Sequence, residues 1–391
     1  MKDRLTNIVS NKKIILVIYI LFALAASIQS LIGTKTYHEG GIVYNRYNNY
    51  TIFEKSFDHL KNYQDLYILY PEEHWDLYKY TPSFSVFFAA FNALPDWLGL
   101  SLWNLLNALV LLSAIYYLPR LSIFQKGCAS IIVLIELMTS MQNQQSNALI
   151  AGLIVFSFGL LERNKSFWAT LCIVFSIFIK LFGIVGFAIF LFYPQKWKSA
   201  LYAIFWTAVL AVLPLLVIDV EQYTKLFYSY INLLKNDHEI SYGYSVMGWL
   251  DSWFSLAINK NVIILIGVFI FLVPLCKFRF YTDFMFKYLV LTSVLLWIVI
   301  FNHKAESPTF ILAMTGVALW FIQSEKNNLN IALFAFAFVF TTLSPTDIFP
   351  RFLREEFVKP YVLKAVPCIL IWVKIIYDMI TLRKEVAPTP Q

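Results

Sequence analysis

The sequence predicts an all-α polytopic membrane protein. Of its 391 residues, 59% are hydrophobic, 18% are aromatic and only 14% are charged, whereas soluble domains carry roughly one quarter charged residues. Apolar runs recur along the whole chain, and no strand-rich segment, low-complexity linker or convincing repeat separates them. We therefore expect one integral membrane domain over residues 1–391.

The first apolar run, residues 14–32, is about 19 residues long and is sufficient for one crossing of a bilayer. Four basic residues precede it: Lys2, Arg4, Lys12 and Lys13. Ala23-Leu24-Ala25 resembles a signal-peptide cleavage site. Because many further runs follow, we interpret the first run as an uncleaved span with its N-terminus in the cytoplasm.

The remaining runs predict core spans within 98–217 and C-terminal spans within 261–380, separated by a large outer loop, 218–260. Individually they cover residues 98–118, 122–139, 147–161, 167–181, 183–193, 200–217, 261–275, 285–301, 308–323, 330–343 and 361–380. Several are shorter than the roughly 20 residues of a straight span, so we expect helices to extend beyond them and some to be broken. Within the first outer loop, 33–97, Pro82 to Ala93 is interpreted as a re-entrant or juxtamembrane helix.

Lysine and arginine decide the orientation, because short basic loops stay in the cytoplasm. They concentrate in 119–126, 162–166, 194–199, 276–284 and the C-terminal tail, whereas 139–146 contains none and falls outside. This arrangement predicts about twelve crossings of the plasma or inner membrane, with both termini cytoplasmic. The net charge of +7 is dispersed over these loops, which indicates contact with membrane lipids rather than a nucleic-acid surface.

Several classes of site are not supported by the residues. The four cysteines form no CxxC pair, so neither a disulfide framework nor a zinc site is indicated. There is no Walker motif, no GxGxxG and no Asp-x-Asp pair. A sugar nucleotide held through a divalent metal is therefore unsupported, and no cofactor or metal is expected.

The stretch from Tyr44 to Thr81 is rich in acidic and aromatic residues. Its carboxylates are Glu54, Asp58, Asp65, Glu72, Glu73 and Asp76. A carboxylate can take a proton from a hydroxyl nucleophile, and tyrosines can stack on sugar rings. Asp76 and Glu73 are the preferred bases, because they precede the return of the chain to the membrane; a solvated connecting loop is the alternative.

The other acids of this stretch are weaker candidates. In 49–61 the residues Phe53, Phe57 and Leu60 form an apolar helical stripe that Asn48 or Asn49 could cap. Glu54 and Asp58 then fall on the more polar, solvated face of the helix, and Asp65 opens a turn.

A phosphate group at the outer surface needs positive charge nearby. His303 and Lys304 are candidates, with Glu306 as their partner or as a further base; an interfacial anchor in which Lys304 snorkels is the alternative. Lys180 lies deep in an apolar region and could bind substrate or cap a broken helix.

Polar residues elsewhere leave similar alternatives. Gln144, Gln145 and Asn147 could bind a sugar hydroxyl or a phosphate, or cap the next helix. Asp237 and His238 could form a dyad or simply be exposed. Trp103, Asn104 and Asn107 lie at i, i+1 and i+4 of a helix, where asparagines more often hold helices together.

Several short motifs occur in a characteristic order. They are Tyr80-Thr81-Pro82, Leu94-Pro95, Trp103-Asn104-x-x-Asn107, Gln144-Gln145-Ser146-Asn147 and Phe178-Ile179-Lys180. Together with the acidic first loop, this order resembles glycosyltransferase family 87, the polyprenyl-phosphate-mannose-dependent mannosyltransferases, from about residue 44 to about residue 200.

The resemblance implies a GT-C-type membrane bundle and an inverting transfer of a hexose, mannose above all. The implied donor is a polyprenyl-phosphate sugar, and the implied acceptor is a hydroxyl of a lipid or glycan at the extracytoplasmic face. The family expects an aspartate base early in the first loop, but that position here is Asn49, and an amide accepts no proton at neutral pH.

Two further interpretations remain open. A catalytically inactive homologue would account for Asn49. A transporter or flippase of a lipid-linked or small polar substrate would account for the many spans, but such proteins tend to show two matching halves with paired broken helices. In this chain the polar residues lie mostly outside the spans, which favours an enzyme.

Overall fold

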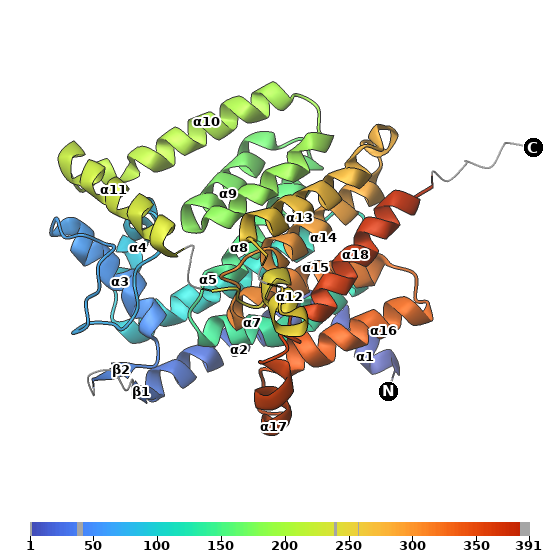
Figure 1. Ribbon diagram of the computed structural model, residues 1–391, viewed down its shortest axis with the longest axis horizontal. Helices are drawn as coiled ribbons and strands as arrows, with labels where there is room; N and C mark the ends of the chain where they lie inside the picture. Colours follow the sequence, from blue (N-terminus) through green and yellow to red (C-terminus); the bar gives the residue numbers. More distant parts are fainter. Residues whose placement is uncertain (1, 37–41, 238–240, 257, 384–391) are drawn as a thin grey trace, which may run out of the picture. The chain divides into compact units, whose positions relative to one another are not determined.

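The computed structural model describes residues 2–36, 42–237, 241–256 and 258–383, and over this part of the chain it is predominantly helical (Figure 1). The strands described are β1 (Thr34–Thr36) and β2 (Val43–Asn45), which pair antiparallel with Lys35 opposite Tyr44. The predicted all-α class is confirmed.

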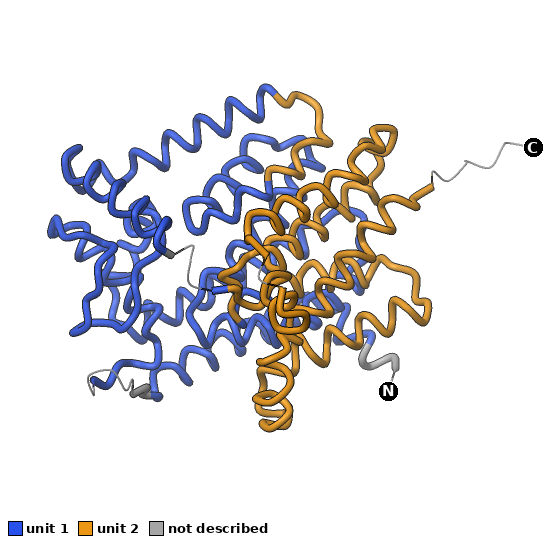
Figure 2. Tube along the Cα trace, viewed as in Figure 1, with its two compact units in different colours: residues 1–186, 197–241, 307–312 blue, residues 187–196, 242–306, 313–391 orange. Residues whose placement is uncertain are grey.

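The chain forms two compact units, coloured separately in Figure 2. Unit 1 contains residues 1–186, 197–241 and 307–312, and unit 2 contains residues 187–196, 242–306 and 313–391. Helices that lie wholly in unit 1 are α1 (Lys2–Val9), α2 (Lys12–Ile32), α3 (Asn48–Lys61), α4 (Pro82–Asn92), α5 (Asp96–Tyr117), α6 (Ile123–Ile132), α7 (Leu134–Gln142), α8 (Asn147–Leu161), α9 (Ser166–Ile179), η2 (Leu213–Leu216), α11 (Val220–Asp237) and η4 (Ser307–Thr309).

The core of unit 1 is built around α5, which packs against α2 and α8. Asn104 Nδ2 donates a hydrogen bond to Ser27 Oγ of α2 at 3.0 Å, and Asn107 Oδ1 accepts one from the backbone N–H of Leu149 in α8 at 3.0 Å. Both asparagines are buried. The prediction that they hold helices together is therefore confirmed.

A helix over Pro82 to Ala93 and the general expectation that some apolar runs are broken are confirmed, whereas the re-entrant or juxtamembrane placement of that helix stays a prediction. The run Pro82 to Ala93 forms α4, whose 11 residues begin with Pro82 at a position where its missing N–H costs nothing. The run 122–139 is broken into α6 and α7, which are bent by 44° relative to each other. Ser122 and Gln125 fix the start of α6 with a reciprocal capping box.

Unit 2 contains further helices and shorter turns. They are α12 (Val246–Phe254), α13 (Lys260–Leu275), η3 (Phe278–Phe280), α14 (Phe284–Ile300), α16 (Asn328–Ala337), η5 (Phe338–Leu343), α17 (Arg351–Leu353), η6 (Arg354–Val358) and α18 (Val366–Thr381). Three segments run across the division between the units: η1 (Leu181–Phe192), α10 (Lys196–Val212) and α15 (Phe310–Gln323). Within unit 2, α18 packs against α13, α14 and α16.

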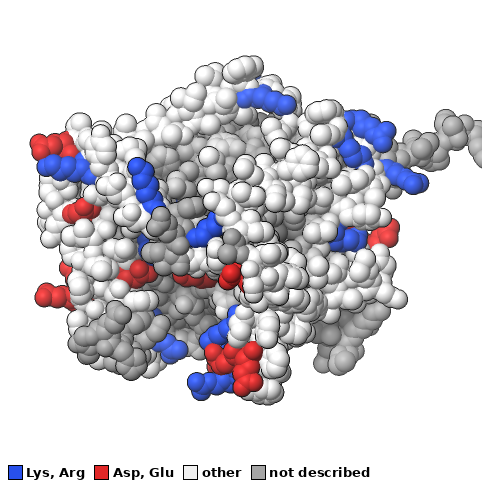
Figure 3. Space-filling view, in the orientation of Figure 1, with Lys and Arg blue, Asp and Glu red and all other residues white. Residues whose placement is uncertain are grey.

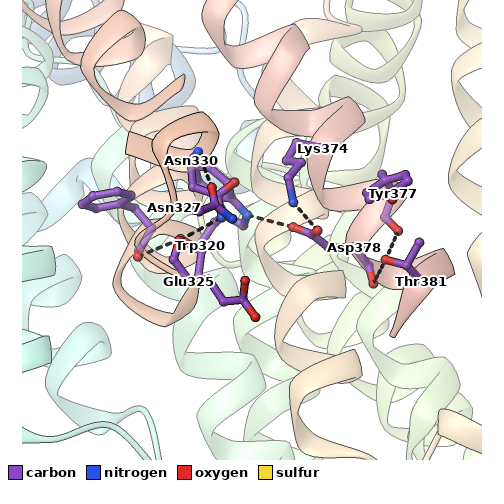
Figure 4. Close-up of polar contacts among 10 residues, drawn as sticks. Trp320, Glu325, Asn327, Asn330, Lys374, Tyr377, Asp378 and Thr381 are labelled. Carbon is purple, nitrogen blue, oxygen red and sulfur yellow. Dashed lines mark hydrogen bonds and ion pairs between the residues drawn. The ribbon is translucent and has the colours of Figure 1, made fainter. Parts of the chain in front are cut away.

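A polar contact joins α15 to α18 within unit 2 (Figure 4). Lys374 forms an ion pair with Asp378 one turn later, and Trp320 Nε1 lies 3.4 Å from the other carboxylate oxygen of Asp378. Lys277 Nζ donates hydrogen bonds to the carbonyls of Met379, Ile380 and Leu382. A cation thus satisfies the carbonyl groups that the end of a helix leaves unpaired.

Apolar helices with exposed surfaces support membrane insertion. By length and composition, α2, α5 and the continuous helix Lys196–Leu216 could each cross a bilayer, and the bent pair α6–α7 would make a fourth span. Only 11% of the apolar window of Lys196–Leu216 is buried, as expected for a lipid-facing helix. Charged residues are sparse on the face drawn in Figure 3.

Within the described ranges, seven shorter apolar helices accompany these four candidates. They bring no confirmation of about twelve crossings, so that count and the sides of the termini stay predictions.

Candidate functional site

Four residues singled out from the sequence, three as candidate substrate contacts and Tyr80 as part of a motif, meet in unit 1. Lys180 Nζ donates hydrogen bonds to Gln145 Oε1 and Asn147 Oδ1, both at 3.0 Å. The hydroxyl of Tyr80 donates to the same Gln145 oxygen at 3.3 Å, and Lys180 Nζ lies 5.5 Å from the centre of the Tyr80 ring. We call Tyr80, Gln145, Asn147 and Lys180 the lysine cluster.

The position of Lys180 follows from the way α9 ends. Helix α9 stops at Ile179, and Lys180 adopts an extended backbone (φ −141°, ψ 130°), which turns its side chain out of the helical path. The Thr81 hydroxyl donates to the carbonyl of Phe178 at 2.5 Å. This bond ties the residue beside Tyr80 to the last turn of α9.

The turn that carries Gln145 is fixed by bonds to three other segments. Trp103 Nε1 donates to the carbonyl of Gln144 at 2.8 Å, and Gln144 Nε2 donates to Ser30 Oγ at 2.9 Å. Asn49 Nδ2 donates to the carbonyl of Asn143 at 2.9 Å. Asn49 therefore links α3 to this turn.

Two expectations about capping are wrong. Helix α8 follows Ser146 without a side-chain cap, and Asn147 instead accepts from Lys180. Helix α3 begins at Asn48 after Tyr47, also without a side-chain cap, because Asn48 Oδ1 accepts from the backbone N–H of Trp75 and Asn49 reaches Asn143. At both positions the asparagine side chains bond to residues distant in the sequence and not to the N–H groups of the first helical turn.

The two preferred bases differ in their surroundings. The Asp76 carboxylate is 41% exposed and lies 3.5 Å from Lys79 Nζ, an exposed pair that holds a side chain only weakly. Glu73 Oε2 instead lies 2.9 Å from His59 Nε2, and the His59 side chain is 5% exposed. Glu73 is 38% exposed, so the two carboxylates are similarly accessible and differ in their partners: His59 for Glu73, and Lys79 and the Leu77 N–H for Asp76.

His59 was not among the residues singled out from the sequence. It lies in the last turn of α3 and stacks on Tyr70, with ring centroids 3.8 Å apart. Burial lowers its pKa, which the Glu73 carboxylate opposes, and burial likewise lowers the pKa of His74. The signal in the sequence was a second histidine in the same acidic loop.

Glu54 is buried, contrary to the prediction that it lies on a solvated face. It is 9% exposed in α3, which packs against α4. Burial raises the pKa of Glu54 to about 7, and the nearby Asp96 carboxylate adds to this. Tyr47 donates a hydrogen bond to Asp96 at 2.8 Å.

Asp65 behaves as expected, since its Oδ1 accepts from the N–H of Tyr67 at 3.0 Å, as at a turn.

The remaining predicted site residues, His303, Lys304 and Glu306, lie in unit 2. Asn302 Oδ1 accepts from the N–H of Lys304 at 2.9 Å, and the Tyr244 N–H donates to the Ala305 carbonyl at 2.8 Å. The segment 302–306 is thus held in an ordered turn. His238, named with Asp237 as a possible dyad, lies outside the described residues.

One comparison with known proteins identifies the family. The family model for glycosyltransferase family 87 matches residues 78–345, more than half of the 391 residues. The match includes Tyr80, Gln145, Asn147 and Lys180 and extends beyond the range expected from the motifs, but it begins after Asn49, Glu73 and Asp76. No curated protein matches the chain significantly. The chain belongs to glycosyltransferase family 87.

Proposed function

We propose that this membrane glycosyltransferase moves a hexose, with mannose as the expected sugar, from a polyprenyl-phosphate donor to a hydroxyl of a lipid or glycan acceptor. The reaction takes place at the extracytoplasmic face of the cell membrane. The observation that carries the proposal is the lysine cluster, which joins a cation, two amide groups and an aromatic ring within a glycosyltransferase chain.

The lysine cluster suits a phosphate bound beside a sugar. Gln145 and Asn147 present neutral amide oxygens to Lys180, and these hydrogen bonds orient its ammonium group. The buried ring of Tyr80 stacks on Phe84 and packs beside the same cation, which helps to hold the ammonium in place. The predicted topology brings the end of α9, the 139–146 turn and the first loop to the outer side of the membrane.

The proposed reaction is a direct displacement. A carboxylate takes the proton of the acceptor hydroxyl as its oxygen attacks the anomeric carbon, and the bond from that carbon to the phosphate oxygen breaks. The electron pair leaves with the polyprenyl phosphate, whose charge Lys180 stabilises. Asp76 is the proposed base, because Glu73 is occupied by His59. His303 and Lys304 lie in unit 2 and stay candidates for phosphate binding on the sequence alone, as does Glu306 for a base.

The test measures transfer of radiolabel from a polyprenyl-phosphate hexose to a lipid extract, using membranes that contain the full chain. Lys180→Met and Asp76→Asn are each expected to lower transfer at least 100-fold at unchanged expression. Lys198→Met is the matched control, because Lys198 is an exposed lysine in α10 outside the site.

The outcomes separate the assignments. Loss in Lys180→Met with retention in the control supports phosphate binding by the lysine cluster. Wild-type activity in Asp76→Asn rules out Asp76 as the base. If the wild-type chain transfers no label from any polyprenyl-phosphate sugar, the proposed donor class is wrong.

A further inference from the structure

We propose that His59, Glu73 and His74 bind a divalent transition-metal ion, for which Zn²⁺ is the best chemical match. One potential ligand atom from each residue lies within 4.8 Å of the other two. Helix α3 provides His59, and the loop that follows provides the adjacent pair Glu73 and His74. The proposal does not depend on the proposed function, because none of its tests measures glycosyl transfer.

Tyr70 preorganises the three residues. Its backbone carbonyl accepts hydrogen bonds from the N–H groups of Glu73 and His74, both at 3.0 Å. Its ring stacks on His59, and its hydroxyl donates to the carbonyl of Asp65 at 2.7 Å. Both histidines are therefore held by packing around one residue. This packing reduces the conformational entropy that their side chains would lose on binding a ligand.

His74 carries an unsatisfied polar atom. The residue is 2% exposed, and its Nδ1 has no hydrogen-bond partner among the described residues. A buried polar atom without a partner is costly, on the order of 1–3 kcal/mol, and such groups in folded proteins call for an explanation. A metal ion bound by the three residues would supply the missing interaction.

Two imidazole nitrogens and one carboxylate oxygen form a ligand set typical of Zn²⁺. Bonds of about 2.0–2.2 Å to a tetrahedral ion place donor atoms roughly 3.3 Å apart. His59 Nε2 and Glu73 Oε2 are already 2.9 Å apart, so the cluster closes around an ion mainly by side-chain movement of His74. The ion binds neutral His59 through Nε2, so the ring proton that faced Glu73 moves to Nδ1 by exchange with solvent, and a water molecule completes the fourth position.

The metal would join α3 to the segment that leads to Asp76 and Tyr80. Glu73 and His74 immediately precede Trp75, whose N–H already bonds to Asn48 at the start of α3. A second attachment near the end of α3 would restrict this loop further. It would also commit Glu73 to the ion, which agrees with the choice of Asp76 as the base.

The experiment uses the full chain, purified in detergent with a tag that contains no histidine and stripped of metal with a chelator. Zn²⁺ binding is measured by competition with a chromophoric chelator, and visible absorption is recorded after addition of Co²⁺. The variants are Glu73→Gln and His74→Gln. Asp58→Asn is the matched control, because Asp58 is a neighbouring carboxylate on α3, 40% exposed and paired with Lys55.

We expect wild type and Asp58→Asn to bind one Zn²⁺ per chain and both ligand variants to bind at least 10-fold more weakly. Wild type with Co²⁺ should show the intense visible bands of a tetrahedral site. That spectrum needs no variant, so it remains informative if a substitution prevents folding. Absence of stoichiometric Zn²⁺ in wild type, absence of the tetrahedral Co²⁺ spectrum, or unchanged affinity in folded ligand variants would overturn the proposal.

Discussion

Glu54→Gln is expected to make the protein more stable at pH 8 and to change its stability little at pH 4. In the folded chain the pKa of Glu54 is raised from 4.5 to about 7 by burial and by Asp96. Because the folded pKa exceeds the unfolded one, the folded state retains the proton more strongly. Its stability falls as pH rises from 4.5 to about 7 and then stays constant.

The magnitude follows from the difference between the two pKa values. At about 1.4 kcal/mol per tenfold change in proton affinity, the ionised carboxylate costs about 3 kcal/mol above pH 7. A neutral amide of nearly the same shape avoids this cost. The melting temperature of Glu54→Gln should therefore exceed that of wild type by roughly 5 °C at pH 8.

The assay is thermal unfolding of the detergent-solubilised full chain between pH 4 and pH 8. The difference between the wild-type and variant curves isolates Glu54, since His59 and His74 contribute equally to both. Glu72→Gln, at an exposed carboxylate in the loop after α3, should differ from wild type by the same amount at pH 4 and at pH 8. A Glu54→Gln protein that melts at or below the wild-type temperature at pH 8 would refute the reasoning.

Two further predictions concern packing. Asn107→Leu leaves the buried N–H of Leu149 without its acceptor and should lower the free energy of unfolding by about 1–3 kcal/mol, measured by denaturant unfolding in detergent. Ser101→Ala, at an exposed site on the same helix, is the control. Equal stability of the two variants would contradict the assignment. Lys277→Met removes the cation bonded to the last carbonyls of α18. It should lower the free energy of unfolding by about 1 kcal/mol and speed proteolysis at the C-terminus. Arg279→Met, at a neighbouring exposed cation, is the control and should leave the rate of proteolysis unchanged.

Much of the lysine cluster could be predicted as a set of residues but not as a set of contacts. Lys180 was identifiable because a cation within an apolar region is costly, and Gln145 and Asn147 because they lie in a polar turn between apolar runs. Their alternative roles as helix caps were equally compatible with the sequence. Only the meeting of α9 with the 143–147 turn showed that the amide oxygens accept from Lys180.

Glu54 and His59 show where reasoning from the sequence failed. Helical periodicity assigned Glu54 to a polar face, but α4 and the start of α5 approach that part of α3 and bury it. His59 appeared unremarkable in a last helical turn, where basic residues are common. Its importance depends on Glu73, 14 residues later, and a contact at that separation leaves no periodic signal.

The sequence by itself determined the membrane class, the helical architecture and the short helix α4, because apolar periodicity, proline and capping residues act over a few neighbouring positions. It predicted that some helices would be broken but did not locate the break between α6 and α7. The tertiary structure decided which carboxylates are buried, which amides face the lysine and which histidines meet. These properties depend on segments that are distant in the chain. When such segments pack together, their side chains give up hydrogen bonds to local groups and to water and form hydrogen bonds with each other.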